Sequence, residues 1–327
     1  MMVISFIIPV YNVQKYIEDC LISILCQLNN KVEIIFINDG TEDNSIKIVE
    51  SYIKDLSLEQ QQNFVIIHQK NLGQSAARNN AIEIAKGQYI GFIDSDDVIA
   101  ENYFENILNI IENYEPDIIR FKYATFNRLL NESIPQNIFL PNEGMERLNN
   151  DILINIFNDM AWFSFINVIK KNFFDQNKYP IGVYFEDVSL ISKIFTQAKN
   201  IYFLNETLYF YRLHQNSSIR NSSANNILKI IHSHKEILRE MDIRLKKEKI
   251  YSSIFVSFSI SYFNLLIKTG KINKALRQHF IFKNYKRNID KKYLKNKLYY
   301  CYYYYGLTYL LVTYTAKLLN HMRIKRK

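Results

Sequence analysis

Cysteine is scarce in this sequence, and its spacing excludes the common zinc sites. The 327 residues contain three cysteines, Cys20, Cys26 and Cys301, and no CxxC pair. Structural zinc sites usually draw on such pairs. Cys20 and Cys26 also fall on one predicted helix. We therefore expect a protein of a reducing compartment without a structural zinc site.

Glycine-rich phosphate loops are also missing. The chain has eight glycines, and none of them belongs to a GxxxxGK[ST] loop or to a GxGxxG turn after a strand. Such loops hold phosphate groups through closely spaced backbone N–H groups. A nucleotide would therefore have to be held through a metal ion and scattered side-chain contacts.

Signals for export or membrane insertion are weak. The first residues, "MMVISFIIPVYN", lack a basic region and reach Pro9 quickly, so they predict a β-strand and not a signal peptide. The uncharged run at 254–267 is too short to cross a bilayer. A hydrophobic fraction of 48% and a charged fraction of 22% indicate a folded globular protein.

Charge is distributed unevenly along the chain. Residues 1–223 contain 18 basic and 27 acidic residues, a net charge of −9. Residues 224–327 contain 23 basic and 5 acidic residues, a net charge of +18. This asymmetry suggests that the two segments have different functions, one of them on an anionic surface.

The first 125 residues alternate strand and helix patterns. Continuous apolar runs predict buried strands at 3–9, 32–38, 64–68 and 88–94. Helical periodicity lies between them, at 17–28, 44–56 and 74–86. The alternation predicts a parallel α/β sheet that binds ligands at the carboxyl ends of its strands. An α+β extension with a strand region at 200–214 follows, and the chain is predicted to be helical from about 224 onward.

Two residues are expected to cap these helices, one at a helix start and one at a helix end. Asn12 is available as an N-cap for the first helix, and Gly87 stands where a helix C-cap is favoured.

The most acidic polar cluster after a predicted strand is "DSDD" at 94–97. An acidic turn of this kind is commonly a solvated cap, so four residues alone are a weak signal. Mg²⁺, however, is usually held through one or two carboxylates together with substrate phosphates. Asp94 and Asp96 at a strand end suit that arrangement. Repulsion among three carboxylates also favours a bound cation.

Four stretches together resemble the inverting family 2 glycosyltransferases. They are "SFIIPVYN" (5–12), "FINDGTEDNS" (36–45), "NLGQSAARNNAIEIAKGQYIGFIDSDD" (71–97) and "YPIGVYFEDVSLISKIF" (179–195), in the order found in that family. The resemblance covers about residues 3–220. It implies an α/β catalytic domain of the GT-A fold over 1–223, with a nucleotide-binding half up to about 125 and an acceptor half at 126–223. A basic, tyrosine-rich helical region at 224–327 follows.

The resemblance also implies roles on the donor side. Asp39 matches the acidic residue that accepts a hydrogen bond from uracil, although the family often has Asp where this chain has Asn38. Arg78 falls near the donor's phosphates, and a surface salt bridge is its alternative. Asp94 and Asp96 match the DxD pair, with Asp94 nearer the ribose and Asp96 on the metal. The implied donor-binding residues are Pro9, Val10, Tyr11, Asp39, Arg78, Asp94, Ser95 and Asp96.

"FED" at 185–187 matches the position of the family's catalytic base. An inverting transfer needs a carboxylate that removes the proton of the acceptor hydroxyl as its oxygen attacks the anomeric carbon. The family pattern implies Asp187 as the base, with Glu186 on the acceptor side. Alternatively, both acids complement the dipole at a helix start.

Two further residues are assigned by resemblance. His214 follows an aromatic strand, where related enzymes place a His or Arg that reaches the diphosphate or the metal; a lone His is otherwise more often structural. Trp162, the sole tryptophan, matches an aromatic near the acceptor sugar, and a core aromatic is its alternative. The implied metal ligands are Asp96 and His214, and the implied cofactor is Mn²⁺ or Mg²⁺.

The C-terminal region carries a candidate membrane segment. Residues 298–316 are 19 uncharged residues, close to the minimum for a span, but eight of them are tyrosines, which prefer the headgroup interface. With "RIKRK" and the charge of +18, this favours an interfacial helix on an anionic cytoplasmic leaflet over a true span or a basic helical cap. No known nucleic-acid motif appears, so nucleic acid is not expected as a partner.

The resemblance therefore implies a metal-dependent, inverting glycosyltransferase, similar to the bacterial enzymes of capsule, lipopolysaccharide or other cell-surface glycan synthesis. It would move a sugar from a UDP-sugar to a hydroxyl of a glycan or lipid-linked acceptor, at the inner face of the cytoplasmic membrane. Two alternatives stay open. A sugar nucleotidyltransferase should carry a glycine-rich, basic loop after the first strand, and "PVYNVQKY" has no glycine. A non-catalytic membrane or nucleic-acid binding module should have a broken DxD pair or base.

Overall fold

The chain folds into two compact units. The computed structural model describes residues 2–214, 223–306 and 308. The first unit comprises Met1–Asn149, Ala161–Gly182 and Glu186–Asn221, and the second comprises Asn150–Met160, Val183–Phe185 and Ser222–Lys327. The sequence places one boundary at 223/224, whereas the structure groups two short earlier segments, 150–160 and 183–185, with the helical unit.

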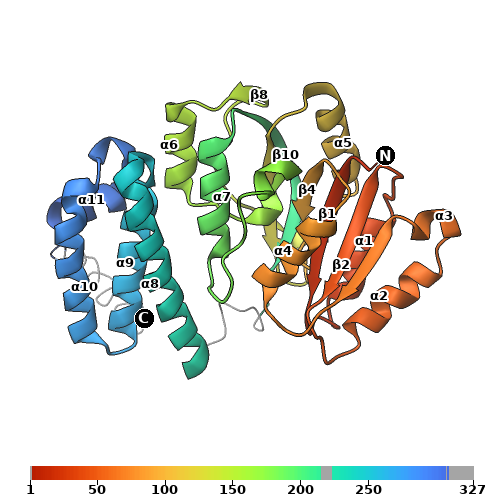
Figure 1. Ribbon diagram of the computed structural model, residues 1–327, viewed down its shortest axis with the longest axis horizontal. Coiled ribbons are helices and arrows are strands. Elements are labelled where there is room, and N and C mark those ends of the chain that lie inside the picture. Colours follow the sequence, from red (N-terminus) through yellow and green to blue (C-terminus); the bar gives the residue numbers. More distant parts are fainter. Residues whose placement is uncertain (1, 215–222, 307, 309–327) are drawn as a thin grey trace. The chain divides into compact units, whose positions relative to one another are not determined.

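The sheet of the first unit begins with a parallel half. Its strands are β1 (Ile4–Val10), β2 (Val32–Asn38), β3 (Phe64–His68) and β4 (Tyr89–Phe92). They lie in the order β3-β2-β1-β4, and each neighbouring pair is parallel (Figure 1). β1 and β2 are buried at nearly every position, as expected for a parallel sheet covered on both faces. These strands coincide with the four predicted from apolar runs.

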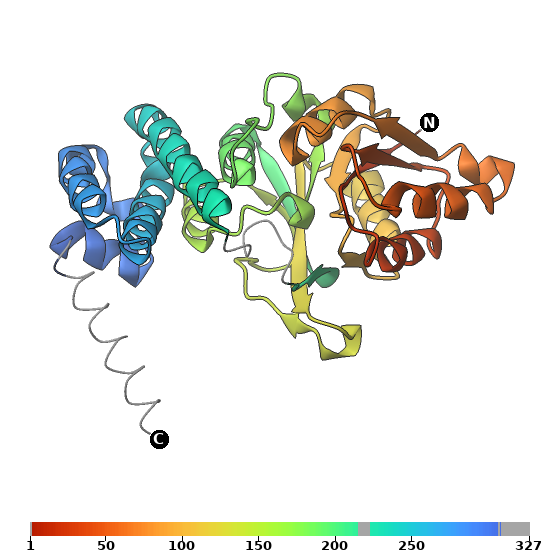
Figure 2. The same ribbon diagram turned by 90° about the horizontal axis from the view of Figure 1, so that it is seen from below.

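The other half of the sheet is mixed. It continues through β9 (Asn167–Lys170), β6 (Ile118–Phe126), β10 (Asn200–Arg212) and β5 (Val98–Ile99). β9 is antiparallel to both of its neighbours, and β6 is parallel to β10. The short strands β7 (Ile134–Pro135) and β8 (Gly144–Arg147) add to β6 and β10, and the segment that carries β7 extends away from the body of the sheet (Figure 2).

Amphipathic helices complete the first unit. They are α1 (Ile17–Leu25), α2 (Ser45–Lys54), α3 (Leu58–Gln61), α4 (Gln74–Ile84), α5 (Tyr103–Tyr114) and α7 (Glu186–Gln197), with 3-10 turns at Leu130–Glu132, Ser164–Ile166 and Lys171–Phe174. The predicted periodicity of the first helix is confirmed, because Ile17, Leu21 and Ile24 are fully buried. These side chains join the same core as Phe6 and Phe36 of the sheet.

Both predicted helix ends are wrong. Asn12 does not cap α1; its side chain instead accepts hydrogen bonds from the Glu42 N–H (3.0 Å) and the Thr41 hydroxyl (3.1 Å). Helix α4 has Ala85 as its C-cap, two residues before Gly87. Gly87 is needed for close packing, since a Cβ there would lie 2.4 Å from a backbone nitrogen of β1.

The second unit is helical. It contains α6 (Asn150–Asp159), α8 (Ala224–Lys247), α9 (Ser252–Lys268), α10 (Ile272–Tyr285) and α11 (Lys297–Tyr305), with 3-10 turns at Lys249–Tyr251, Lys286–Asn288 and Lys291–Tyr293. α9 is its central element, because α6, α8, α10 and α11 all pack against it. Figure 1 shows α8, α9 and α10 side by side.

One helical segment passes the length test for a membrane span. Within the described residues, Lys249–Lys268 is 20 residues long and apolar enough by composition, and it contains the uncharged run 254–267, which alone is too short. However, 72% of its most apolar window is buried, as in a core helix. The predicted interfacial segment 298–316 lies partly outside the described residues, since 307 and 309–316 are not among them.

Candidate active site

The predicted donor-side turns lie at the switch point of the sheet. The chain runs outward from β1 to β3 and then returns to place β4 on the other side of β1. Open α/β sheets bind ligands where the strand order reverses in this way, beyond the carboxyl ends of the strands. The turn after β4 contains "DSDD", and the turn after β1 begins at Tyr11. The fold therefore brings these two turns to one edge.

The acidic loop after β4 uses its last carboxylate to hold its own shape. Asp97 is fully buried, and its oxygens accept hydrogen bonds from the Tyr209 hydroxyl and the Arg212 backbone N–H, both at 2.7 Å. Burial raises the pKa of Asp97 well above its ordinary value. The Asp94 backbone N–H donates to the same Tyr209 oxygen at 2.9 Å. Strand β10 thus fixes the loop and leaves the side chains of Asp94 and Asp96 for other partners.

Asp96 pairs with His214. Asp96 Oδ2 and His214 Nε2 are 2.8 Å apart, and Nδ1 of the same ring is buried without a hydrogen-bond partner among the described residues. The ring of Tyr16 lies against the imidazole, with ring centroids 4.6 Å apart. The Asp96 side chain keeps 26% of its surface exposed. The structure therefore brings together the two residues that the sequence predicts as metal ligands.

Few side chains that could bind a metal ion surround this pair. In the described part of the chain, no group of three or more His, Cys, Asp or Glu side chains is arranged to hold a metal ion. Mg²⁺ commonly takes one or two protein carboxylates and completes its shell with water and phosphate oxygens. A carboxylate with an adjacent imidazole fits an ion that arrives with a phosphate-bearing substrate.

Arg78 connects the acidic loop to the helix that carries the predicted base. Its side chain is 2% exposed, and its guanidinium contacts Asp94 (Nη2–Oδ1, 2.8 Å), Glu186 (Nη1–Oε1, 3.2 Å) and Asp187 (Nη1–Oδ1, 3.2 Å). The guanidinium carbon also lies 5.4 and 5.5 Å from the centroids of two aromatic rings. The alternative of a surface salt bridge is wrong, because the residue is buried. Its predicted approach to donor phosphates stays a prediction.

This network holds more negative than positive charge. Burial is the main cause of a pKa of about 6 for Asp94 and about 7 for Glu186. Neighbouring carboxylates, Asp187 among them, raise both values further, while Arg78 opposes the shift. A cation bound nearby would relieve the excess of negative charge.

Ser164 holds Asp187 in place. Its hydroxyl lies 2.6 Å from Asp187 Oδ1, and its backbone N–H donates to Oδ2 at 3.2 Å. The Ser164 hydroxyl is the donor in this pair, and a serine hydroxyl has only one proton to give. The Tyr179 hydroxyl, 2.6 Å from the same Ser164 oxygen, must then donate to it. Oδ2, with the longer hydrogen bond, is the oxygen more available to an acceptor hydroxyl.

Asp39 binds the loop that precedes α4. Its oxygens accept hydrogen bonds from the Gln69 side chain (2.7 Å) and from the backbone N–H groups of Leu72 (2.8 Å) and Gly73 (2.9 Å). Asp39 is 4% exposed. The structure therefore gives this carboxylate a role in holding the loop, and its predicted bond to a uracil ring stays a prediction.

The remaining donor-side residues differ in exposure. Pro9 and Val10 end β1, and Val10 is fully buried. Ser95 is buried in the acidic loop. Tyr11 is 45% exposed, so among these four it presents a large side chain to an incoming ligand.

Trp162 lies in the core. It is 1% exposed and packs edge-on against Phe195 of α7, with ring centroids 5.9 Å apart. This placement favours the alternative interpretation, a core aromatic, and the acceptor-side role of Trp162 stays a prediction. The neighbouring Phe163 is 39% exposed and stacks on Phe165, with centroids 5.1 Å apart.

Several residues that shape the site were not predicted. Tyr209 and Arg212 hold the acidic loop, and Ser164 and Tyr179 hold Asp187. Tyr179 opens the stretch "YPIGVYFED" that carried the resemblance, so the sequence offered a signal for it. Ser164 has no such signal, because an isolated serine between aromatic residues is ordinary.

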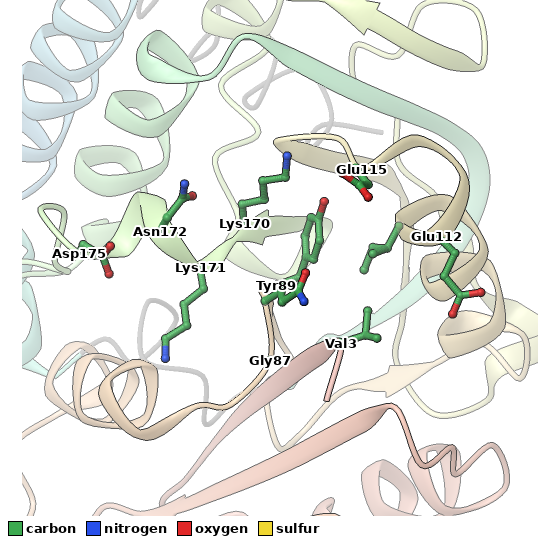
Figure 3. A pocket seen from close by; sticks show the side chains of 11 residues that line it. Val3, Gly87, Tyr89, Glu112, Glu115, Lys170, Lys171, Asn172 and Asp175 are labelled. Atoms are coloured by element: carbon green, nitrogen blue, oxygen red, sulfur yellow. The ribbon is translucent and has the colours of Figure 1, made fainter. Parts of the chain in front are cut away.

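A cavity of about 630 Å³ lies at the opposite end of the sheet. Figure 3 shows its lining, which includes Val3 before β1, Gly87 before β4, and two lysines. Lys170 pairs with Asp117 at 3.4 Å, and Lys171 donates to a backbone carbonyl. Both lysines therefore have partners, and the cavity lies away from the carboxyl ends of β1 and β4.

Comparison with known proteins identifies the family. The model of "Glycosyl transferase family 2" matches residues 5–171. Glycosyltransferase GlyG of Streptococcus pneumoniae is 30% identical over 232 residues, which cover 66% of this chain and 73% of GlyG. Glycosyltransferase GlyA of the same organism is 32% identical over 225 residues, 66% of this chain but 31% of GlyA. The chain thus spans about a third of GlyA.

A further relative and two solved structures are similar. The minor teichoic acid biosynthesis protein GgaB of Bacillus subtilis is 30% identical over 67% of this chain and 24% of GgaB. S. aureus TarS 1–349 in complex with UDP-GlcNAc has a TM-score of 0.70 at 20% identity, covering 93% of this chain and 87% of that one. Mannosyltransferase PcManGT from Pyrobaculum calidifontis, in complex with GDP-Man and Mn²⁺, has a TM-score of 0.56 at 12% identity, covering 97% and 80%.

At these identities the structures show the fold alone, and the family rests on the sequence matches. The chain therefore belongs to glycosyl transferase family 2, a family of inverting glycosyltransferases, and has the GT-A fold.

Proposed function

We propose that this chain transfers a sugar from a nucleotide-sugar, a UDP-sugar in particular, to a hydroxyl group of a glycan or lipid-linked acceptor in bacterial cell-surface polysaccharide synthesis. One observation carries the proposal: Arg78 contacts both Asp94 of the DxD loop and Asp187 on α7. Direct transfer requires the donor-holding loop and the base to flank one reacting centre, and a shared buried guanidinium fixes their separation.

Asp187 is proposed to remove the acceptor's proton. The acceptor oxygen forms a bond to the anomeric carbon, the bond from that carbon to the diphosphate oxygen breaks, and the acceptor proton passes to Asp187 Oδ2. Ser164 would keep Oδ1 occupied during this step. Glu186 is the weaker candidate, because the family pattern matches Asp187 and because Ser164 donates two hydrogen bonds that orient Asp187.

The donor's diphosphate is proposed to bind beside Asp96 and His214. These residues would hold Mg²⁺ or Mn²⁺, which when bound offsets the charge of the departing diphosphate. Support comes from their mutual distance of 2.8 Å and from the similar proteins TarS, solved with UDP-GlcNAc and with UDP, and PcManGT, solved with GDP-Man and Mn²⁺. Tyr11, Asp39 and Arg78 are proposed to contact the nucleotide.

The chain is proposed to act at the inner face of the cytoplasmic membrane. GgaB is named for minor teichoic acid biosynthesis, which supports a cell-surface polymer as the acceptor. The net charge of +18 over residues 224–327 supports attachment to an anionic leaflet.

The test is turnover of a panel of nucleotide-sugars by purified protein, followed as release of the nucleoside diphosphate. We expect release from at least one UDP-sugar, loss of release on chelation, and loss in Asp96→Ala while the variant keeps its fold. Full activity after chelation would remove the metal from the proposal. No turnover of any donor, with or without added acceptor glycans, would favour the non-catalytic alternative.

A further inference from the structure

Helix α10 of the second unit has an exposed apolar row. Ile272, Leu276 and Phe280 are 56, 38 and 62% exposed. Their spacing of four residues places them along one side of the helix. The side of α10 that contains Ala275 and Phe282 is buried. The helix is therefore anchored by one side while it presents large apolar groups on another.

Basic residues on α10 and in the turn that follows it have no acidic partners within the described residues. They are Lys274, Arg277, Lys283, Lys286 and Arg287, and residues 249–289 contain no Asp or Glu. Within the described ranges, none of the five takes part in an ion pair. On α8, in contrast, Arg239, Arg244 and Lys246 are each paired with an acid on the same helix. The positive charge around the row is thus left for an external partner.

Aromatic and basic groups lie against one another across this region. Lys283 Nζ is 5.7 Å from the centroid of the Phe280 ring. Lys286 Nζ is 4.8 Å from the centroid of the Tyr303 ring on α11. Phe282 contacts Tyr302 of α11 with ring centroids 4.6 Å apart, so the two helices pack together. Tyr303 of α11 therefore lies beside the basic turn that follows α10.

We propose that this face, made of Ile272, Leu276, Phe280, Lys283, Lys286 and Tyr303, docks on a bilayer surface that contains anionic lipid. Apolar side chains enter the boundary of the acyl region, tyrosine takes the headgroup level, and lysines meet lipid phosphates. The lack of acidic residues favours an anionic surface over a mixed-charge protein interface. This rests on the proposed membrane location; the face shares only Tyr303 with the segment 298–316 and otherwise lies outside it.

The experiment uses the full chain and sedimentation with vesicles. Vesicles of phosphatidylcholine alone are compared with vesicles that also contain phosphatidylglycerol. The variant Leu276→Ser/Phe280→Ser should bind the anionic vesicles at least about tenfold more weakly than wild type, because two inserted apolar groups are lost. The matched control is Ile243→Ser on α8, which is 60% exposed in wild type and should bind as wild type does.

A fluorescent reporter adds an independent readout. Phe280→Trp should shift its emission to the blue on anionic vesicles but not on neutral ones, and Trp162 contributes a constant background because it is 1% exposed. A companion variant replaces the basic residues of "RIKRK" by glutamine and should retain the blue shift.

Two results would overturn the proposal. They are equal binding of the anionic vesicles by the double-serine variant and wild type, and an unshifted emission of the bound Phe280→Trp variant. Donor turnover, measured in solution without vesicles, should be the same in wild type and the double-serine variant. A protein that binds vesicles through this face but turns over no donor would sink the proposed function while leaving the docking face intact.

Discussion

Arg78 of the first unit and Arg277 on α10 of the second unit hold their positive charges in opposite settings. In the first unit, Arg78 is 2% exposed and its nitrogens contact three carboxylates. In the second, Arg277 on α10 is exposed and has no ion pair among the described residues. Buried, paired charges hold a fixed geometry, which chemistry requires. Exposed charges of one sign instead attract a surface within about a Debye length. The net charge of +9 therefore describes neither unit.

Replacing one arginine in each unit tests this difference between buried and exposed charge most strongly. Arg78→Met should lower the free energy of unfolding by roughly 3–5 kcal/mol, because it leaves buried carboxylates without their counter-charge. Arg277→Met should change it by less than about 0.5 kcal/mol, as an exposed site allows. Chemical denaturation of both variants measures this. Similar losses in the two variants would contradict the distinction between the units.

Asp187→Asn should reduce turnover at least about a hundredfold while donor affinity is kept, since the amide still accepts a hydrogen bond but no longer takes a proton. Glu186→Gln should have a milder effect. Steady-state kinetics and calorimetry with the nucleoside diphosphate separate the two quantities. If Glu186→Gln proves the more damaging, the assignment within the pair is reversed.

Ser164→Ala should lower kcat by about tenfold and leave the KM for donor unchanged, because one hydrogen bond to a charged group is lost. Tyr179→Phe should lower kcat less, since it acts through Ser164. Steady-state kinetics measures both variants, and a kcat equal to that of wild type would make Ser164 a packing residue only.

The smallest effect concerns stability and pH. The pKa of Glu186 is raised from an ordinary value near 4.5 to about 7 in the folded chain, chiefly by burial. The folded state therefore binds more protons in this window, and the stabilisation present below pH 4.5 is lost as pH rises through 7. Glu186→Gln should be more stable than wild type at pH 8, on the order of 1 kcal/mol, and not at pH 5. Thermal melting of both proteins measures this. If the difference in stability between Glu186→Gln and wild type is the same at pH 5 and pH 8, the pKa of Glu186 is not raised.

The sequence predicts well what depends on local patterns. The apolar runs of β1 to β4 and the residues Ile17, Leu21 and Ile24 of α1 lie where periodicity places them. The meeting of Asp94 with Asp187 could be expected only from the family resemblance, since 93 positions separate them in the printed chain. It was the resemblance, not composition, that selected these two acids.

What could not be predicted depends on long-range contacts. Tyr209 reaches Asp97 across 112 positions, and Arg78 reaches Asp187 across 109. Nothing near Arg78 in the sequence shows that its guanidinium is buried among carboxylates. Gly87 shows the same limit, because the requirement for a small residue is set by β1 and not by the helix that precedes it.

The central claim, an inverting transfer supported by Asp187, is tested most directly by proton NMR of the first sugar product formed from an α-linked UDP-sugar. The account predicts a product of β configuration, observed before mutarotation in hydrolysis or as a stable β-linkage on an acceptor. Its rate should fall at least about a hundredfold in Asp187→Asn. An α-configured first product, or the same rate in the variant, would contradict the account.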